Sequence, residues 1–224
     1  MNYYPITIID NFLKKPDKFR KFALNQEFYS ANNLKNFGGN STFPGWRSKD
    51  LREINADIFK IFFSKVISIF HPDDYDPIHW EIEAYFQTVP KQFQEGVIHN
   101  DYNTLLAGIL YLHPNPIENS GTSIYKTNSL FNENDFVEGT KQNDYRKNIT
   151  SPNINYHTMF TQIMSIENIY NRIILYEGHE YHKADHFFGD TIDNSRLTLV
   201  FFVKNIKANN NKSFAQNRIK AIDI

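Results

Sequence analysis

The residues best suited to chemistry are an imidazole and a carboxylate two positions apart. His99 and Asp101 belong to the run Ile98-His99-Asn100-Asp101, which precedes the apolar segment Thr104–Leu112. If the chain is extended or turning there, both side chains face one cation. Two imidazoles and one carboxylate form a facial set of ligands that leaves open positions on a divalent metal ion. We therefore expect His99 and Asp101 to supply two of the three ligands of such a site.

The His-x-Asp pattern is short, and it occurs a second time at His71-Pro72-Asp73. Short motifs arise by chance, so their surroundings must separate them. The copy at His71 stands in a Pro- and Asp-rich turn directly after a helical pattern. The copy at His99 precedes an apolar strand and has further polar residues downstream. We interpret His71 as the end of a helix and His99 as the candidate ligand.

A third ligand has three candidates, which follow the apolar run Arg172–Tyr176 and a Gly turn. His179 is expected in the turn itself. His182 and His186 stand beyond it, at slightly different distances from the next strand. Spacing alone leaves these two open as the distal ligand.

Arg196 begins the apolar segment Ser195–Phe202. A buried guanidinium without a partner is unfavourable, and a carboxylate satisfies it through two parallel hydrogen bonds. Thr198 lies two positions further and so on the same face of a strand, where its hydroxyl can reach the same group. The pair indicates an anion-binding site. The alternative is that Arg196 is a structural ion-pair residue.

Elements that position these side chains are predicted from the apolar pattern. Pro16 and the apolar residues after it predict a helix near residues 16–24, and Lys49–Phe70 has the apolar face of a second helix. Residues 126–160 are polar and indicate an insertion or lid, with a short helix around Thr158–Tyr170. Two helices before many strands predict a mainly β sandwich or barrel with helices on one face. The expected strands are Tyr4–Asp10, Trp80–Thr88, Thr104–His113, Gly121–Tyr125, Arg172–Tyr176 and Leu197–Val203.

Composition narrows the class of protein. The 224 residues include no Cys, which excludes disulfides and thiolate metal sites. The formal net charge is −1, and the basic residues are scattered, so no electrostatic footprint for nucleic acid or an anionic membrane is visible. No window approaches the ~18–20 apolar residues that span a bilayer. We expect one cytoplasmic domain over residues 1–224, with neither a nucleic-acid nor a membrane partner.

These motifs together give the chain a family likeness. It resembles the 2-oxoglutarate/Fe(II)-dependent oxygenase superfamily, nearest its small bacterial and viral members similar to prolyl-4-hydroxylases. The likeness runs through nearly the whole chain. Its specific parts are the metal-ligand residues and the Arg-x-Ser/Thr pair. The segments that carry it are Ile9–Leu13, Phe43–Arg47, Tyr85–Gln87, His99-x-Asp101, Tyr111–Leu112, Gly121–Thr122, Asn171-Arg172…Tyr176-x-Gly178-x-x-x-His182 and Arg196-x-Thr198.

The resemblance implies a double-stranded β-helix, or jelly roll, and a role for each site residue. His99, Asp101 and His182 would ligate Fe(II), with His186 as the runner-up for the distal position. Halogenating relatives carry a small residue in place of the carboxylate, so Asp101 implies hydroxylation or a related oxidation.

The cosubstrate residues also follow from the resemblance. Arg196 and Thr198 would bind the distal carboxylate of 2-oxoglutarate. Tyr111 and Tyr85, on inward-facing strands, would be further donors to the cosubstrate, although core packing explains either residue equally well. The Trp46–Arg47 pair either lines the substrate mouth or forms a structural turn.

The expected function is oxidation of a small molecule, an amino acid or a peptidyl side chain, with O2 and 2-oxoglutarate consumed and succinate and CO2 released. Three alternatives stay open. In the first, the chain is a metal-dependent oxygenase that does not use 2-oxoglutarate, and Arg196 is structural. In the second, it is a non-enzymatic jelly-roll module that binds metal or ligand. In the third, it is a degenerate oxygenase that acts as a regulator or scaffold.

Overall fold

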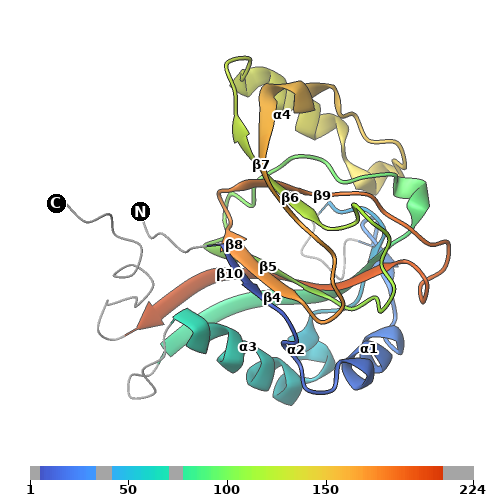
Figure 1. Cartoon of the computed structure of the whole chain (residues 1–224), viewed down its shortest axis with the longest axis vertical. Helices are drawn as coiled ribbons and strands as arrows, with labels where there is room; N and C mark the ends of the chain where they lie inside the picture. Colours follow the sequence, from blue (N-terminus) through green and yellow to red (C-terminus); the bar gives the residue numbers. More distant parts are fainter. Residues whose placement is uncertain (1–5, 34–41, 71–77, 209–224) are drawn as a thin grey trace.

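Two antiparallel sheets with helices on one side make up the chain (Figure 1). The structure is a computed structural model, and it describes residues 6–33, 42–70 and 78–208. Three helices lie against one face of the larger sheet, and helix α4 (Glu133–Gln142) lies at the other end of the molecule, beyond the smaller sheet. The predicted mainly β fold with helices on one face is confirmed.

The larger sheet has seven strands in the order β1-β8-β5-β10-β4-β3-β2. Strands β4 and β10 form its long centre, with Arg196 opposite Val89 and Ala208 opposite Ile78. The strands in this spatial order are β1 (Thr7–Ile9), β8 (Ile173–Glu177), β5 (Leu106–Tyr111), β10 (Arg196–Ala208), β4 (Ile78–Val89), β3 (Trp46–Arg47) and β2 (Tyr29–Ser30).

The smaller sheet has three strands in the order β7-β6-β9. These are β7 (Phe160–Ile166), β6 (Thr122–Thr127) and β9 (Tyr181–Ala184). An isolated bridge between His99 and His182 joins the segment after β4 to the free edge of β9. This bridge brings the His99 segment to the smaller sheet.

Strand β5, near the centre of the larger sheet, is buried on both faces. Leu106 and Leu110 pack into the core beneath the helices, whereas Ala107, Ile109 and Tyr111 face the smaller sheet. Alternate side chains of a strand point to opposite faces, and both faces of this strand are covered. On β10 the same alternation puts Arg196, Thr198, Val200 and Phe202 on the side of the smaller sheet, because the residues between them belong to the helix-side core.

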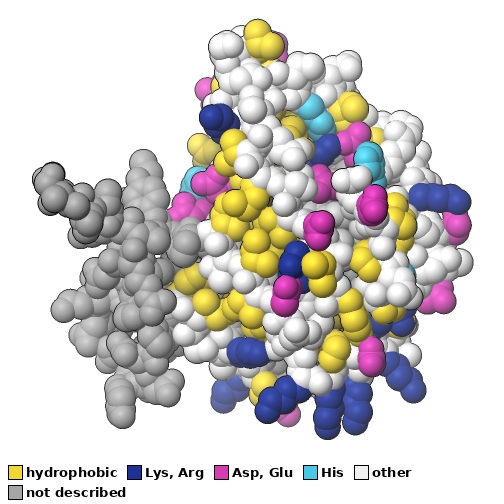
Figure 2. All heavy atoms as spheres, viewed as in Figure 1, with side chains coloured by type: hydrophobic (Ala, Val, Ile, Leu, Met, Phe, Trp, Pro, Cys, Tyr) yellow, Lys and Arg dark blue, Asp and Glu magenta, His cyan; other side chains and the backbone are white. Residues whose placement is uncertain are grey.

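Helices α1 (Pro16–Leu24), α2 (Leu51–Ile54) and α3 (Ala56–Phe70) cover the outer face of the larger sheet. Aromatic rings dominate this contact, since the ring of Phe63 meets that of Phe201 on β10 at a centroid distance of 5.2 Å. Edge-to-face pairs of this kind add to the stabilisation from apolar burial. Figure 2 shows Lys and Arg side chains gathered on the outer side of these helices.

Two predicted helices differ from the structure. The expected helix Lys49–Phe70 is broken at Asn55, whose backbone is extended and whose Oδ1 accepts a hydrogen bond from Ile58 N at 2.9 Å. Asn55 thus caps the start of α3. Asn side chains favour such capping positions over the interior of a helix, because they hydrogen-bond to nearby backbone groups. The expected helix at Thr158–Tyr170 is wrong, because residues 160–166 form β7, preceded by a 3₁₀ turn, η4 (Asn155–Met159). The apolar residues of this segment have helical spacing, but pairing with β6 overrides it.

The six expected strands are present with shifted ends, and β2, β3 and β9 are strands that the sequence did not predict. β10 runs to Ala208, well past the expected Val203, and Trp46–Arg47 forms the short strand β3 rather than a turn. The His71-Pro72-Asp73 copy of the motif lies outside the described residues. Among the described residues, no helix combines the length and the apolar character needed to cross a bilayer.

Candidate metal centre

Backbone pairing positions the three candidate ligands. His99 N donates to His182 O at 3.0 Å, and His182 N donates to His99 O at 2.9 Å, so the two residues lie directly opposite each other. Asp101 N donates to Gly178 O at 2.7 Å, in the turn that leads into β9. The turn can approach this closely because Gly178 lacks a Cβ, which would meet Thr104 O at 2.2 Å.

The three side chains converge on one point. One potential ligand atom from each of His99, Asp101 and His182 lies within 4.8 Å of the others. Nε2 of His182 is 3.6 Å from Asp101 Oδ2, and Nε2 of His99 is 3.9 Å from Asp101 Oδ1. These separations are too long for hydrogen bonds between the side chains. The group therefore has lone pairs directed at a shared space.

The opposite ring nitrogen of each imidazole is held by a carbonyl. His99 Nδ1 lies 2.8 Å from Val97 O, and His182 Nδ1 lies 2.8 Å from Glu180 O. Because a carbonyl only accepts, Nδ1 must carry a proton in each ring, so Nε2 is the lone-pair nitrogen of the neutral tautomer. Metal-binding histidines have this arrangement, in which a carbonyl partner fixes both tautomer and ring orientation.

Electrostatics also fit a cation at this point. Burial and the neighbouring His99 lower the pKa of His182 to about 4, so this imidazole is neutral at pH 7. Oδ2 of Asp101 is buried and has no hydrogen-bond partner among the described residues. A buried carboxylate oxygen left unpaired is unfavourable, and a divalent cation would satisfy it. The donor set of two imidazoles and one carboxylate suits Fe(II).

The other two histidines of the distal segment lie elsewhere. His179 and His186 are both exposed, and neither belongs to the convergent group. His186 N donates to Asn119 O at 2.8 Å, and the residue forms a bridge with Glu95. Of the three candidates, the structure brings only His182 to His99 and Asp101.

Arg196 is buried at the start of β10, where its side chain donates hydrogen bonds to uncharged carbonyl groups. Its Nε donates to Ser120 O at 2.8 Å, and Nη2 donates to Gly121 O at 3.1 Å. It makes no ion pair with a carboxylate among the described residues, although its side chain lines the same cavity as the metal ligands. The guanidinium is thus a buried positive charge that makes no ion pair among the described residues.

Tyr111 and Thr198 lie close to Arg196 but turn to other partners. The ring of Tyr111 is 5.4 Å from the Arg196 guanidinium carbon, and its hydroxyl is 2.8 Å from Thr122 Oγ1. Thr198 Oγ1 donates to Gln87 O at 3.4 Å. Neither residue is among the described residues that line the cavity, and their contact with a bound ligand stays a prediction.

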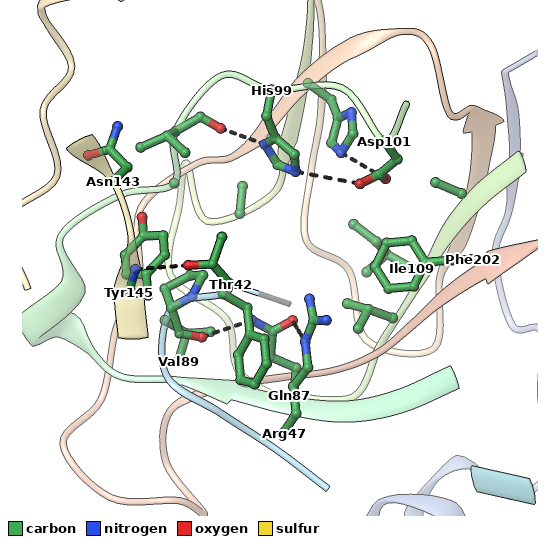
Figure 3. Close-up of a pocket in the computed structure, with 18 of the residues that line it drawn as sticks. Thr42, Arg47, Gln87, Val89, His99, Asp101, Ile109, Asn143, Tyr145 and Phe202 are labelled. Atoms are coloured by element: carbon green, nitrogen blue, oxygen red, sulfur yellow. Dashed lines mark hydrogen bonds and ion pairs between the residues drawn. The ribbon is translucent and has the colours of Figure 1, made fainter. Parts of the chain in front are cut away.

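A cavity of about 320 Å³ opens beside the three ligands (Figure 3). Its apolar lining includes Ile109, Val200 and Phe202 from the larger sheet. For Arg47 the sequence analysis left two roles open, lining of the substrate mouth or a structural turn. In the structure Arg47 lines the cavity together with Gln87. Tyr145 and Asn143 also line it, and sequence reasoning missed both because they stand in the polar segment 126–160 without a motif.

Comparisons with known proteins show which solved structures have a similar fold. No curated protein matches this sequence. The non-heme alpha ketoglutarate dependent epimerase SnoN from nogalamycin biosynthesis aligns at a TM-score of 0.53 and 10% identity, over 99% of this chain and 86% of SnoN. HygX from Streptomyces hygroscopicus, with nickel and 2-oxoglutarate bound, aligns at 0.51 and 8% identity, over 89% and 83%. A Pseudomonas putida prolyl-4-hydroxylase aligns at 0.48 and 10% identity, over 89% and 92%.

At these identities the matches to SnoN and HygX show a shared fold, which is the predicted jelly roll. They are 2-oxoglutarate-dependent or 2-oxoglutarate-binding proteins by their descriptions. The sequence itself matches one family along residues 2–203. The chain therefore belongs to the family of unknown function DUF6445.

Proposed function

We propose that this chain is an Fe(II)- and 2-oxoglutarate-dependent oxygenase, of the kind similar to prolyl-4-hydroxylases. The observation that carries the proposal is the convergence of His99, Asp101 and His182 at a cavity, with both Nε2 atoms turned inward and one carboxylate oxygen unpartnered. Two imidazoles and one carboxylate with open positions are typical of non-haem Fe(II) oxygenases. When bound, the metal would supply O2 activation coupled to decarboxylation of 2-oxoglutarate to succinate and CO2.

In this proposal the chain's residues bind and orient. The carbonyls of Val97 and Glu180 keep the two imidazoles in the ligating tautomer. Arg196 binds the distal carboxylate of the cosubstrate, because its buried charge lacks an anionic partner within the described residues and lines the cavity. A carboxylate would meet its remaining N–H groups with charge-assisted hydrogen bonds. Tyr111, packed against Arg196, keeps the guanidinium in place.

The substrate would be a small molecule, an amino acid or a peptidyl side chain that enters the same cavity. Residues 126–160 would act as its lid, since Thr140, Asn143 and Tyr145 of this segment form part of the cavity wall. Apolar walls exclude water from the reacting centre and so favour oxidation of an unactivated C–H bond.

The first test measures succinate formed from 2-oxoglutarate by protein reconstituted anaerobically with Fe(II) and then given O2 and ascorbate. The wild type should turn over slowly even without substrate. His99→Ala should abolish this turnover, because one imidazole ligand is lost. His186→Ala is the matched control, since it removes an exposed imidazole outside the convergent group, and it should retain wild-type turnover.

Binding measurements support the turnover assay. Titration with Mn(II) and then 2-oxoglutarate should give one metal site, lost in His99→Ala. Arg196→Ala should weaken 2-oxoglutarate binding at least about tenfold, because truncating one partner of a buried charge pair costs about 2–5 kcal/mol. If the wild type binds neither metal nor cosubstrate, the proposal is wrong and a non-enzymatic jelly-roll module is the better account.

A second candidate is a metal-dependent oxygenase that does not use 2-oxoglutarate. It is favoured by one observation, that Arg196 already donates to the carbonyls of Ser120 and Gly121 and so has a structural role. The same titration separates the two candidates. Metal binding without 2-oxoglutarate binding, and an Arg196→Ala variant that loses only stability, would support the second.

A further inference from the structure

We propose that the cavity wall opposite the metal ligands is a carboxylate-binding subsite built on Arg47, and that the substrate of this chain carries a carboxylate there. The inference rests on the proposed function and deepens it by naming the class of substrate. It is independent of Arg196, which belongs to a different strand and has different partners.

The guanidinium of Arg47 is held in place from several sides. Its Nε donates to Gln87 Oε1 at 3.1 Å, and Gln87 Nε2 in turn donates to Pro44 O at 2.9 Å. The guanidinium carbon lies 4.2 Å from the ring centroid of Phe43 and 5.4 Å from that of Phe202. Aromatic faces attract a guanidinium and restrict its motion. A side chain fixed in this way is preorganised for a partner.

The end of the Arg47 side chain is left open for such a partner. Among the described residues, its two terminal nitrogens have no hydrogen-bond acceptor and the group makes no ion pair. In Figure 3 the guanidinium points into the cavity, with His99 and Asp101 across the open space from it. Two parallel N–H groups match the two oxygens of a carboxylate, which gives both affinity and orientation.

The balance of charge in the cavity supports one anionic group on the substrate. Among the described lining residues, Arg47 and Arg196 are the cations and Asp101 is the anion. Ferrous iron and Arg196 would be neutralised by Asp101 together with the two carboxylates of 2-oxoglutarate. The charge of Arg47 then has no ion-pair partner among the described lining residues, in an aromatic environment where a charge without such a partner is unfavourable. A single carboxylate balances it, whereas a phosphate dianion would leave an excess negative charge.

Tyr145 adds an independent sign of a polar ligand. Its side chain is 7% exposed and lines the cavity, and its hydroxyl has no hydrogen-bond partner among the described residues. Tyr145 N donates to Thr42 Oγ1 at 2.8 Å, which ties this residue to the segment that precedes Arg47. A buried hydroxyl without a partner is unfavourable, and a bound acid would provide an acceptor. Apolar side chains between the two polar walls would contact the body of the substrate.

The test measures binding of simple acids to full-length protein that holds Mn(II) and 2-oxoglutarate, without any oxidation. The probes are monocarboxylates from acetate to 3-phenylpropionate, each paired with its neutral amide, and phenylphosphonate as the phosphate-like arm. Ligand-observed NMR reports the dissociation constants. The wild type should bind at least one carboxylate ten or more times more tightly than its amide, and more tightly than phenylphosphonate.

Two variants assign this preference to Arg47. Arg47→Met keeps most of the side-chain volume within the aromatic rings and removes the charge, so the carboxylate and its amide should bind equally. Arg47→Lys keeps the charge but loses the fork, so an intermediate preference of a few fold is expected. In both variants the affinity for 2-oxoglutarate should stay within about twofold of the wild type, whereas Arg196→Met should lose it.

Three outcomes would overturn the proposal. If no acid binds the wild type better than its amide, the wall is not an anion subsite. If phenylphosphonate binds best, the ligand is of another class. If Arg47→Met loses 2-oxoglutarate itself, Arg47 anchors the cosubstrate. Failure of the wild type to bind Mn(II) or 2-oxoglutarate would instead refute the proposed function, and the acid-to-amide ratio of the metal-free protein would still decide whether Arg47 forms a carboxylate subsite.

Discussion

His99 and His182 exchange both backbone hydrogen bonds, at 3.0 and 2.9 Å, and their rings stand 4.4 Å apart between centroids. The pairing of two segments, which are far apart in the sequence, thus holds two candidate metal ligands side by side. Rigid elements position ligands more accurately than loops do.

Replacing Asp101 by Asn should have opposite effects on the metal-free and metal-loaded protein. The carboxylate has a buried oxygen without a partner, 3.6 Å from His182 Nε2. An amide N–H can donate to that nitrogen, so Asp101→Asn should stabilise the metal-free protein by about 1 kcal/mol. The same change removes the anionic ligand and should abolish stabilisation by Mn(II). Thermal unfolding with and without Mn(II) measures both effects, and a destabilised metal-free variant would contradict this account.

Gly178→Ala should impair the site through the backbone. A Cβ at this position would meet Thr104 O at 2.2 Å, and the turn also accepts the hydrogen bond from Asp101 N. The backbone would have to move apart to accommodate the Cβ, which should destabilise the protein by about 1–3 kcal/mol. The same movement should displace Asp101 and lower the affinity for the metal. Urea unfolding and metal titration test this, with His179→Ala as the control in the same turn, because that side chain is exposed. Equal metal affinity in the two variants would count against a positioning role for the turn.

His157 should make the stability of the protein depend on pH. Its Nε2 accepts a hydrogen bond from Ile98 N at 3.0 Å, and burial lowers its pKa to about 4. The unfolded chain, with an ordinary His pKa near 6.5, binds the proton first as pH falls. Stability should therefore decrease between about pH 6.5 and pH 4, by roughly 1–2 kcal/mol after allowance for the partial exposure of the ring.

The comparison with His157→Gln isolates this contribution. Glutamine offers an oxygen to Ile98 N and does not titrate, so the variant should lose less stability than the wild type over the same pH range. Urea denaturation of both metal-free proteins at pH 7 and pH 4.5 gives the difference. Identical pH dependence in the two would mean that His157 does not carry the effect.

Asn143→Ala should loosen the lid while the sheets stay intact. The Asn143 side chain is buried and donates to Gly139 O and Asn153 O, and it accepts from Asn153 N at 2.7 Å. Loss of these bonds leaves backbone groups unpaired and should cost about 1–3 kcal/mol locally. Hydrogen exchange should speed up across residues 133–158 and remain unchanged in β5 and β10. Faster exchange throughout the protein would show instead that Asn143 stabilises the whole fold.

Local patterns predicted most of the framework. β5 and β8 are continuous apolar runs, which are typical of strands covered on both faces. The amphipathic pattern of residues 49–70 predicted a helix there, and α3 buries Phe62 and Val66 of its expected apolar face but exposes Ile61. The helix predicted over residues 158–170 rests on the helical spacing of its apolar residues, whereas in β7 only the end residues Phe160 and Ile166 are buried. Its partner β6 lies outside any local window, and strand pairing depends on that partner.

The candidate site divides in the same way. The types and order of its residues, His99-x-Asp101 with a later His and the Arg at the start of a strand, can be recognised in the sequence alone. The sequence favoured His182 over His186 only through the family resemblance. In the structure, the bridge between His99 and His182 brings the His182 ring close to Asp101, whereas His186 lies outside this group. Arg47, Gln87 and Tyr145 carry no motif, and only the tertiary structure decided that they share one cavity. Covalent neighbours determine local patterns, whereas a binding wall is made by contacts between segments that the chain brings together only when it folds.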